Sequence, residues 1–172
     1  MSAVEHKERA PKRLHVGVIT VSDSRAAAMK EGRDEDISGR VIEEELAKEG
    51  HSSDRTILFD EEDEIKGKIE ELVSNPEVDA IITTGGTGIA RRDRTVDVAC
   101  SLLDKELPGF GETLRRIGYE EHIGGPALLT RATAGIIGRV PIFCLPGAPN
   151  SVRVAMKLIL PELPHVVKHA CE

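Results

Sequence analysis

Short apolar runs alternate with amphipathic stretches through most of this chain. Residues 14–21 (LHVGVITV) and 78–83 (VDAIIT) are mostly apolar, as in strands that are buried on both faces of a parallel sheet. Between them, residues 37–49 and 61–74 carry apolar side chains at helical spacing. Strands that alternate with helices form right-handed βαβ units. We therefore predict an α/β fold, a three-layer sandwich with a mostly parallel central sheet and helices on both faces.

The other expected elements have weaker patterns, and residues 127–137 have no clear one. Gly138 marks a hairpin turn, whereas the charged stretch 25–36 predicts a mobile loop. Asp36 is the expected N-cap of the helix that follows it. We also expect a strand over 55–59, helices over 96–103 and 112–117, a strand over 141–145, and a final helix from about Asn150.

The length of 172 residues fits one domain. Residues 1–13 are polar and predict a flexible N-terminal arm, which leaves residues 14–172 as a single domain. The arm has no apolar centre, so it is no signal peptide, and no apolar run reaches the roughly 18 residues that span a membrane. Three separated cysteines without a C-x-x-C pair exclude a zinc ribbon and fit a reducing compartment. We expect a cytoplasmic protein.

Composition excludes some partners. A net charge of −7 argues against a general nucleic-acid binder, which would be basic. Aromatic residues make up only 2% of the chain, too few for a base-stacking platform. A local site for a phosphorylated small molecule remains compatible with both observations.

Polar or glycine-rich segments follow the predicted strands. Ser22 and Asp23 follow the first strand, Asp60 the second, the segment TGGTG (84–88) the third, and residues 146–151 the last. In open α/β sheets, ligands bind beyond the carboxyl ends of the strands. This convergence predicts a ligand site at that edge of the sheet.

The TGGTG segment offers closely spaced backbone N–H groups that a phosphate can approach. It is not a P-loop, because Ile89 and Ala90 replace the lysine and hydroxyl residue of that motif. It is not a dinucleotide fingerprint, because Arg91 stands where a third glycine or alanine belongs. A tight strand-to-helix turn is the plainer interpretation, but the charged run after it favours phosphate binding.

That run, Arg91 to Arg94, pairs three arginines with Asp93. The arginines can clamp an anion or form a solvated charge run. Asp93, together with Asp60, can hold Mg²⁺, which commonly takes one or two carboxylates plus substrate phosphates. Asp60 alone can equally be a helix N-cap. The six histidines show no metal-ligand pattern; His165 and His169 are four residues apart, and we interpret them as a solvated helix face.

Six segments follow one another in a recognisable order: 18–23 (VITVSD), 36–39 (DISG), 84–88 (TGGTG), Arg92 with Asp93, 107–112 (LPGFGE) and 145–149 (LPGAP). In this order they resemble the MoaB/MogA family of molybdenum cofactor biosynthesis proteins, which includes the gephyrin G domain. Two positions depart from the family pattern: Val96 stands where many relatives have proline, and Ala148 replaces a frequently polar residue.

The resemblance implies a fold, an activity and a site. It implies a three-layer α/β fold in trimers or hexamers, and Mg²⁺-dependent transfer of the adenylyl group of ATP to molybdopterin with release of pyrophosphate. Asp60 and Asp93 match the two essential aspartates of active members, as catalytic residues and metal ligands. Molybdopterin binding is implied for Thr84, Gly85, Gly86, Thr87, Gly88, Gly147, Pro149, Asn150 and Ser151, and position and charge add Ser22, Asp23 and Arg92 as substrate-binding candidates.

Two other hypotheses remain open. A non-catalytic molybdopterin carrier or oligomeric scaffold would share the motifs, but it would have no need of the paired aspartates. A generic phosphate-binding domain explains the glycines but not the full motif set. The sequence does not distinguish a molybdenum from a tungsten pathway, and it predicts no nucleic-acid or membrane partner.

Overall fold

Six strands form a single sheet within the part of the chain that the computed structural model describes, residue 11 and residues 13–172. The strand order is β2-β1-β3-β6-β5-β4. Neighbours among the first four strands run parallel, whereas β5 runs antiparallel to β6 and β4 antiparallel to β5. The strands are β1 (His15–Val21), β2 (Ser52–Leu58), β3 (Ala80–Thr84), β4 (Lys105–Glu106), β5 (Thr133–Ile137) and β6 (Val140–Leu145).

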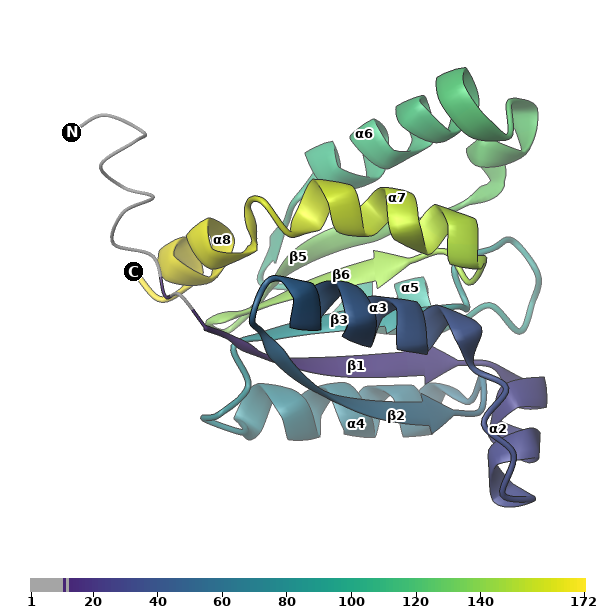
Figure 1. Ribbon diagram of the computed structural model, residues 1–172, viewed down its shortest axis with the longest axis horizontal. Coiled ribbons are helices and arrows are strands. Elements are labelled where there is room, and N and C mark those ends of the chain that lie inside the picture. Colours follow the sequence, from purple (N-terminus) through teal and green to yellow (C-terminus); the bar gives the residue numbers. More distant parts are fainter. Residues whose placement is uncertain (1–10, 12) are drawn as a thin grey trace.

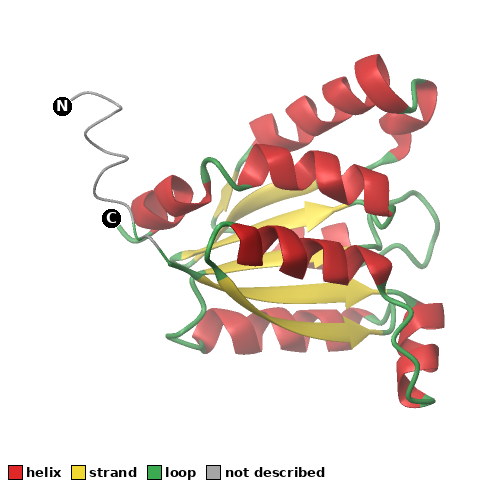
Figure 2. Cartoon of the chain, in the orientation of Figure 1, coloured by secondary structure: helices red, strands yellow, loops and turns green. Residues whose placement is uncertain are grey.

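Helices cover both faces of this sheet (Figures 1 and 2). One buried cluster joins the sheet to α3, α6, α7 and α8, and a second joins the opposite face to α4 and α5. Strand β1 contributes to both clusters, through Val16 and Val18 on one side and Ile19 and Val21 on the other. The three-layer, mostly parallel α/β fold is therefore confirmed. The helices are α2 (Asp23–Lys30), α3 (Ile37–Lys48), α4 (Glu62–Ser74), α5 (Thr95–Leu102), α6 (Pro108–Ile117), α7 (Pro149–Ile159) and α8 (Leu163–Ala170).

Several predicted boundaries were wrong. The loop over 25–36 begins as helix α2, because Ser22 caps it and three consecutive alanines, 26–28, favour helix. Helix α6 starts four residues early, at Pro108, since proline is well suited to the first turn. The single final helix is two, because Pro161 lies between α7 and α8 and cannot continue a helix.

Residues 118–137, mostly without a sequence pattern, contain η1 (Gly118–His122), η2 (Gly125–Leu129) and strand β5. The hairpin turn at Gly138 is confirmed: Gly138 has φ +59°, and Ile137 pairs with Val140. Most of the expected arm, residues 1–13, lies outside the described residues; only Pro11 and Arg13 belong to them. None of the described helices combines the length and apolar character needed to cross a bilayer.

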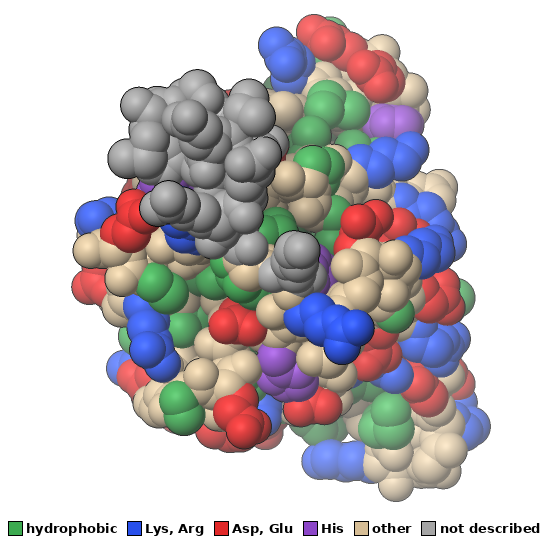
Figure 3. All heavy atoms as spheres, turned by 60° about the vertical axis from the view of Figure 1, so that its left-hand side comes forward, with side chains coloured by type: hydrophobic (Ala, Val, Ile, Leu, Met, Phe, Trp, Pro, Cys, Tyr) green, Lys and Arg blue, Asp and Glu red, His purple; other side chains and the backbone are tan. Residues whose placement is uncertain are grey.

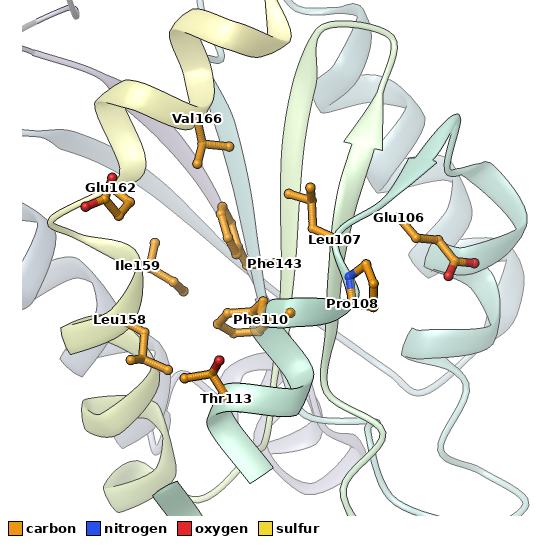
Figure 4. Close-up of a pocket in the computed structure, with 11 residues that line it drawn as sticks. Glu106, Leu107, Pro108, Phe110, Thr113, Phe143, Leu158, Ile159, Glu162 and Val166 are labelled. Carbon is orange, nitrogen blue, oxygen red and sulfur yellow. The ribbon is translucent and has the colours of Figure 1, made fainter. Parts of the chain in front are cut away.

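An apolar hollow of about 460 Å³ opens between α6 and the α7–α8 segment. Figure 4 shows Phe110, Phe143, Leu107 and Val166 around it, and the two phenylalanine rings meet edge to face at 5.4 Å. Glu106 and Glu162 are its charged lining residues. The hollow therefore lacks the converging polar groups that would orient a phosphorylated ligand.

Charge is distributed without a dominant sign on the face drawn in Figure 3, where acidic and basic side chains are interspersed. A broad basic patch is the electrostatic feature that nucleic-acid binding requires. The described residues drawn on that face form no such patch.

The predicted N-cap Asp36 is confirmed and is fully buried. Its carboxylate accepts hydrogen bonds from the Gly39 N–H at 3.0 Å and from the Thr20 hydroxyl at 2.6 Å, and Arg55 pairs with it at 2.9 Å. Arg55 also binds Asp34 at 2.6 Å. One guanidinium thus joins the start of α3 to strand β2.

This cluster predicts a specific acid sensitivity. The hydrogen bond from Arg55 lowers the pKa of Asp34 to about 2. Because the folded pKa lies below the unfolded one, the pair stabilises the fold above pH 4, and this contribution is lost as the pH falls towards 2. We expect Asp34→Asn to lose less free energy of unfolding than the wild type between pH 5 and pH 2.5, measured by urea denaturation. The exposed Asp63→Asn should follow the wild type, and an Asp34→Asn variant that also does so would contradict the prediction.

Candidate active site

The carboxyl ends of β1, β2, β3 and β6 meet at one edge of the sheet, at the arrowheads in Figure 1. Two pockets lie beside each other there and share Gly86 and Asp93. The first, here the acidic pocket, measures about 380 Å³ and is lined by Val21, Ser22, Asp23, Ser24, Asp60, Gly86, Arg92 and Asp93. The second, here the glycine-loop pocket, measures about 400 Å³ and is lined by Gly85, Gly86, Thr87, Gly88, Asp93, Ile123, Pro126, Leu129, Thr130, Pro146, Gly147, Ala148 and Ser151.

Two glycines shape the loop between the pockets. Gly85 has φ +94° and Gly86 φ +64°, values that side-chain-bearing residues rarely adopt. A Cβ on Gly85 would lie 2.2 Å from the Val21 carbonyl oxygen, and one on Gly86 would lie 2.1 Å from the Thr95 Oγ1. The bare backbone therefore lets this loop pack onto β1 and α5 while it faces the pockets.

The loop is also joined to the segment that follows β6. The buried Thr84 hydroxyl donates to the Pro146 carbonyl at 2.8 Å, and the Gly85 N–H donates to the Leu145 carbonyl at 3.1 Å. Gly147 lies against Gly85, and its carbonyl accepts a hydrogen bond from Ser38 at 2.8 Å. Thr84 thus holds the two loops together and does not line either pocket as described.

Helix α7 begins beside the glycine-loop pocket, which Ala148 and Ser151 line. The first N–H groups of a helix lack intrahelical partners, and its dipole favours an anion there. Of the candidates on this segment, Pro149 and Asn150 lie outside both pockets as described; Asn150 instead lines a smaller neighbouring cavity with Ser151. Ser151 and Gly147 are therefore the two that the structure brings to the glycine-loop pocket.

Asp60 lies among other carboxylates in the acidic pocket. Its backbone N–H donates to Asp23 at 3.0 Å, and its carboxylate accepts from the Arg94 N–H at 3.2 Å. Burial raises the pKa of Asp60, and the negative charges of Asp93 and Asp23 raise it further. The alternative role of Asp60 as a helix cap was wrong, because the N-cap of α4 is Glu61. A bound cation would relieve the repulsion among the three carboxylates.

Asp93 stands where the two pockets join. One of its carboxylate oxygens accepts the Ala90 N–H at 2.8 Å and also lies against Gly88. No group of three or more histidine, cysteine, aspartate or glutamate side chains in the described part of the chain is arranged to hold a metal ion. Asp60 and Asp93 are carboxylates of one pocket, and Mg²⁺ commonly takes one or two carboxylates together with substrate phosphates.

Arg131, which was not among the predicted site residues, fixes the loop between the pockets. Its guanidinium donates to the carbonyls of Gly88 at 2.8 Å and Asp93 at 2.7 Å, and it forms a fork with Asp97 at 2.8 and 3.0 Å. Its backbone N–H donates to the Thr87 carbonyl at 2.8 Å. No local motif marks this residue, because all these partners lie more than thirty residues away.

The region around η1 and η2 was missed as well. It supplies an apolar wall to the glycine-loop pocket through Ile123, Pro126 and Leu129, with the hydroxyl of Thr130 beside it. Of the arginines in the run 91–94, Arg92 lines the acidic pocket. Such a pairing of apolar wall and phosphate-type cradle suits a ligand with a ring system and an anionic group.

Residues 17–165 match the model of a family described as a probable molybdopterin binding domain. The chain belongs to this family. The predicted MoaB/MogA resemblance is thereby confirmed. The matched range includes all the residues that line the two pockets and all of the sheet except the first two residues of β1. Both pockets therefore lie within the domain that the family model describes.

Relatives that align with nearly the whole chain support the family assignment. The chain is 45% identical to the molybdopterin adenylyltransferase of Pyrococcus furiosus, over 100% of both proteins. It is 42% identical to molybdenum cofactor biosynthesis protein B of Bacillus cereus, over 96% of each. The crystal structure of the tungsten cofactor synthesizing protein MoaB from Pyrococcus furiosus superposes with a TM-score of 0.81 at 45% identity, over 95% of this chain and 100% of that one.

Proposed function

We propose that this chain is a molybdopterin adenylyltransferase of molybdenum or tungsten cofactor biosynthesis. Its relative in Pyrococcus furiosus carries that name, and the family model describes molybdopterin binding. The observation that carries the proposal is the junction of the two pockets at Gly86 and Asp93. A reaction between two phosphorylated substrates requires two adjoining phosphate sites.

The glycine-loop pocket suits the phosphate and the ring system of molybdopterin. Its donors are the backbone N–H groups of the loop, the start of α7 and the hydroxyls of Thr87 and Ser151, and its apolar wall suits the pterin. The acidic pocket suits the triphosphate of ATP with Mg²⁺, with Arg92 as a further counter-charge.

The proposed reaction is an adenylyl transfer. An oxygen of the molybdopterin phosphate forms a bond to the α-phosphorus of ATP, and the bond from that phosphorus to the β-phosphate bridging oxygen breaks. Adenylylated molybdopterin and pyrophosphate are the products. Asp60 and Asp93 would hold Mg²⁺, which when bound neutralises charge on the triphosphate. The chain itself positions both phosphates, and Arg131 keeps the Gly88 and Asp93 backbone in place.

A non-catalytic carrier or scaffold of the same pathway is the second candidate. The clustering of Asp23, Asp60 and Asp93 disfavours it, because three carboxylates beside a phosphate site repel an anionic ligand unless a cation is recruited. A carrier gains nothing from such repulsion. A nucleotidyltransferase, in contrast, uses the clustered carboxylates to hold the metal ion that accompanies its second substrate.

We also propose a homo-oligomer, a trimer or hexamer, that acts in the cytoplasm on these small molecules, with residues 14–172 as one domain. The exposed side chains of Ile89 and Leu128, which line neither pocket, support self-association, since each is more than half exposed.

A direct assay tests the enzyme against the carrier. Purified protein is incubated with molybdopterin, ATP and Mg²⁺, and pyrophosphate and adenylylated molybdopterin are quantified. We expect equal amounts of the two products, and none when ATP is replaced by its non-cleavable α,β-methylene analogue. Molybdopterin binding without pyrophosphate release would favour the carrier, and absence of binding would contradict both hypotheses.

A further inference from the structure

Helix α8 presents two histidines on a cavity far from the candidate active site. The cavity measures about 420 Å³ and lies against α8, β4 and the β5–β6 turn. In Figure 1, α8 lies at the end of the sheet opposite to the carboxyl ends of the parallel strands. The polar residues that line the cavity are Asp104, Lys105, His165, His169 and Glu172.

The two imidazoles face each other through their outer nitrogens. His165 and His169 are one helical turn apart, and their Nε2 atoms lie 2.8 Å from each other. The ring centroids are 4.5 Å apart, with an angle of 68° between the planes. Both side chains reach solvent, at 29% and 46% exposure, so an ion can enter between them.

A carboxylate stands on the inner nitrogen of each ring. The Nδ1 of His169 lies 2.8 Å from Glu172, and the Nδ1 of His165 lies 3.4 Å from Glu162. A carboxylate favours a proton on the nitrogen that faces it, which in a neutral imidazole leaves the lone pair on Nε2. The two Nε2 atoms lie at hydrogen-bond distance, 2.8 Å, so either a proton or a metal cation must lie between them, since two bare lone pairs would repel each other.

We propose that His165 and His169 bind a divalent transition-metal ion of the Zn²⁺ class through their Nε2 atoms. Two histidines four residues apart on one helix face are a known way to hold zinc. A carboxylate on the ring nitrogen that does not bind the metal, here Nδ1, is the usual second contact of a zinc-bound histidine. At Zn–N distances of about 2.1 Å and a tetrahedral angle, the two nitrogens stand roughly 3.4 Å apart, which a small rotation of the exposed rings provides.

The chemistry of the ligands separates this ion from the Mg²⁺ of the proposed active site. Imidazole suits zinc, copper, cobalt and nickel, whereas Mg²⁺ takes oxygen ligands. Since the described residues offer no group of three metal-binding side chains, water would fill the remaining positions, and the ion would be exchangeable. Val166 stands where a zinc hydrolase motif has glutamate, so the general base of that motif is missing from its usual position.

The ion would therefore link the side chains of His165 and His169 across one turn of α8, and it would not catalyse a reaction. The positive charge of Lys105 in the same cavity repels a cation, whereas the negative charges of Asp104 and Glu172 attract one. The net charge around the pair is thus compatible with a bound divalent ion.

The test is calorimetric titration of the full chain with Zn²⁺ in buffer that contains excess Mg²⁺. We expect one Zn²⁺ per chain in the wild type and at least tenfold weaker binding in His165→Ala and in His169→Ala. His122→Ala, another exposed histidine outside this cavity, should bind as the wild type does. In nitrogen-15 NMR spectra, the Nε2 resonances of His165 and His169 should shift on addition of Zn²⁺.

Three results would overturn the proposal. These are wild-type affinity in either of the two α8 variants, Nε2 resonances that do not move, and affinity no tighter in the wild type than in a variant that combines His165→Ala with His169→Ala. Adenylyl transfer is measured separately in Mg²⁺ alone, so failure of this site leaves the proposed function untouched.

Discussion

Asp93→Asn should abolish pyrophosphate release while the protein stays folded. The substitution removes a negative charge at the junction of the two pockets but keeps an oxygen that can accept the Ala90 N–H. Loss of one group that stabilises transition-state charge costs about 100-fold to 1,000-fold in rate, and a lost metal ligand should cost no less. Asp60→Asn should act alike, since its amide oxygen can still accept the Arg94 N–H. Pyrophosphate release at saturating ATP measures the effect.

The matched control is Asp63→Asn, three residues beyond Asp60 in the exposed first turn of α4. It makes the same change in charge outside both pockets, so it should retain full activity. Thermal unfolding of all three variants should stay within a few degrees of the wild type. Full activity in Asp60→Asn or Asp93→Asn would remove that residue from the proposed metal site.

The fold was predictable wherever burial alone set the pattern. Strand β1 is apolar on both faces because it lies between two buried clusters, and its sequence shows this directly. The start of the 25–36 stretch was misjudged because charged residues surround the alanines that form α2. Strand β4 is only two residues long, so its pairing with β5 depends on tertiary contacts and not on a local period.

The location of the candidate site at one edge of the sheet could be expected from the topology. Parallel strands end at one edge, so Asp60 and Asp93 could be expected to meet from sequence positions far apart. The role of Arg131 could not be predicted, because it depends on hydrogen bonds to the carbonyl groups of Gly88 and Asp93, and only folding brings these groups close to it. Pro149 carried the family motif, yet it lies outside both pockets as described, since it starts α7.

Gly85→Ala should cause the largest loss of stability among single methyl additions in the glycine loop. The new Cβ would lie 2.2 Å from the Val21 carbonyl oxygen, which belongs to the backbone of the buried strand β1 and cannot rotate away. The positive φ of +94° adds strain of about 1–3 kcal/mol, and overpacking adds about 1–3 kcal/mol more. We expect the free energy of unfolding to fall by roughly 2–6 kcal/mol, measured by urea denaturation.

The variant Gly50→Ala separates the effect of backbone strain from the effect of overpacking. Gly50 has a similar φ of +81°, but a Cβ there would meet nothing within 4 Å. This variant should therefore lose the conformational part alone, about 1–3 kcal/mol. The difference between the two variants measures how tightly the glycine loop packs on β1, and equal losses would mean that the loop can move away from the strand. A loop free to move would not hold a fixed phosphate cradle, so this comparison also tests whether the proposed binding site is preformed.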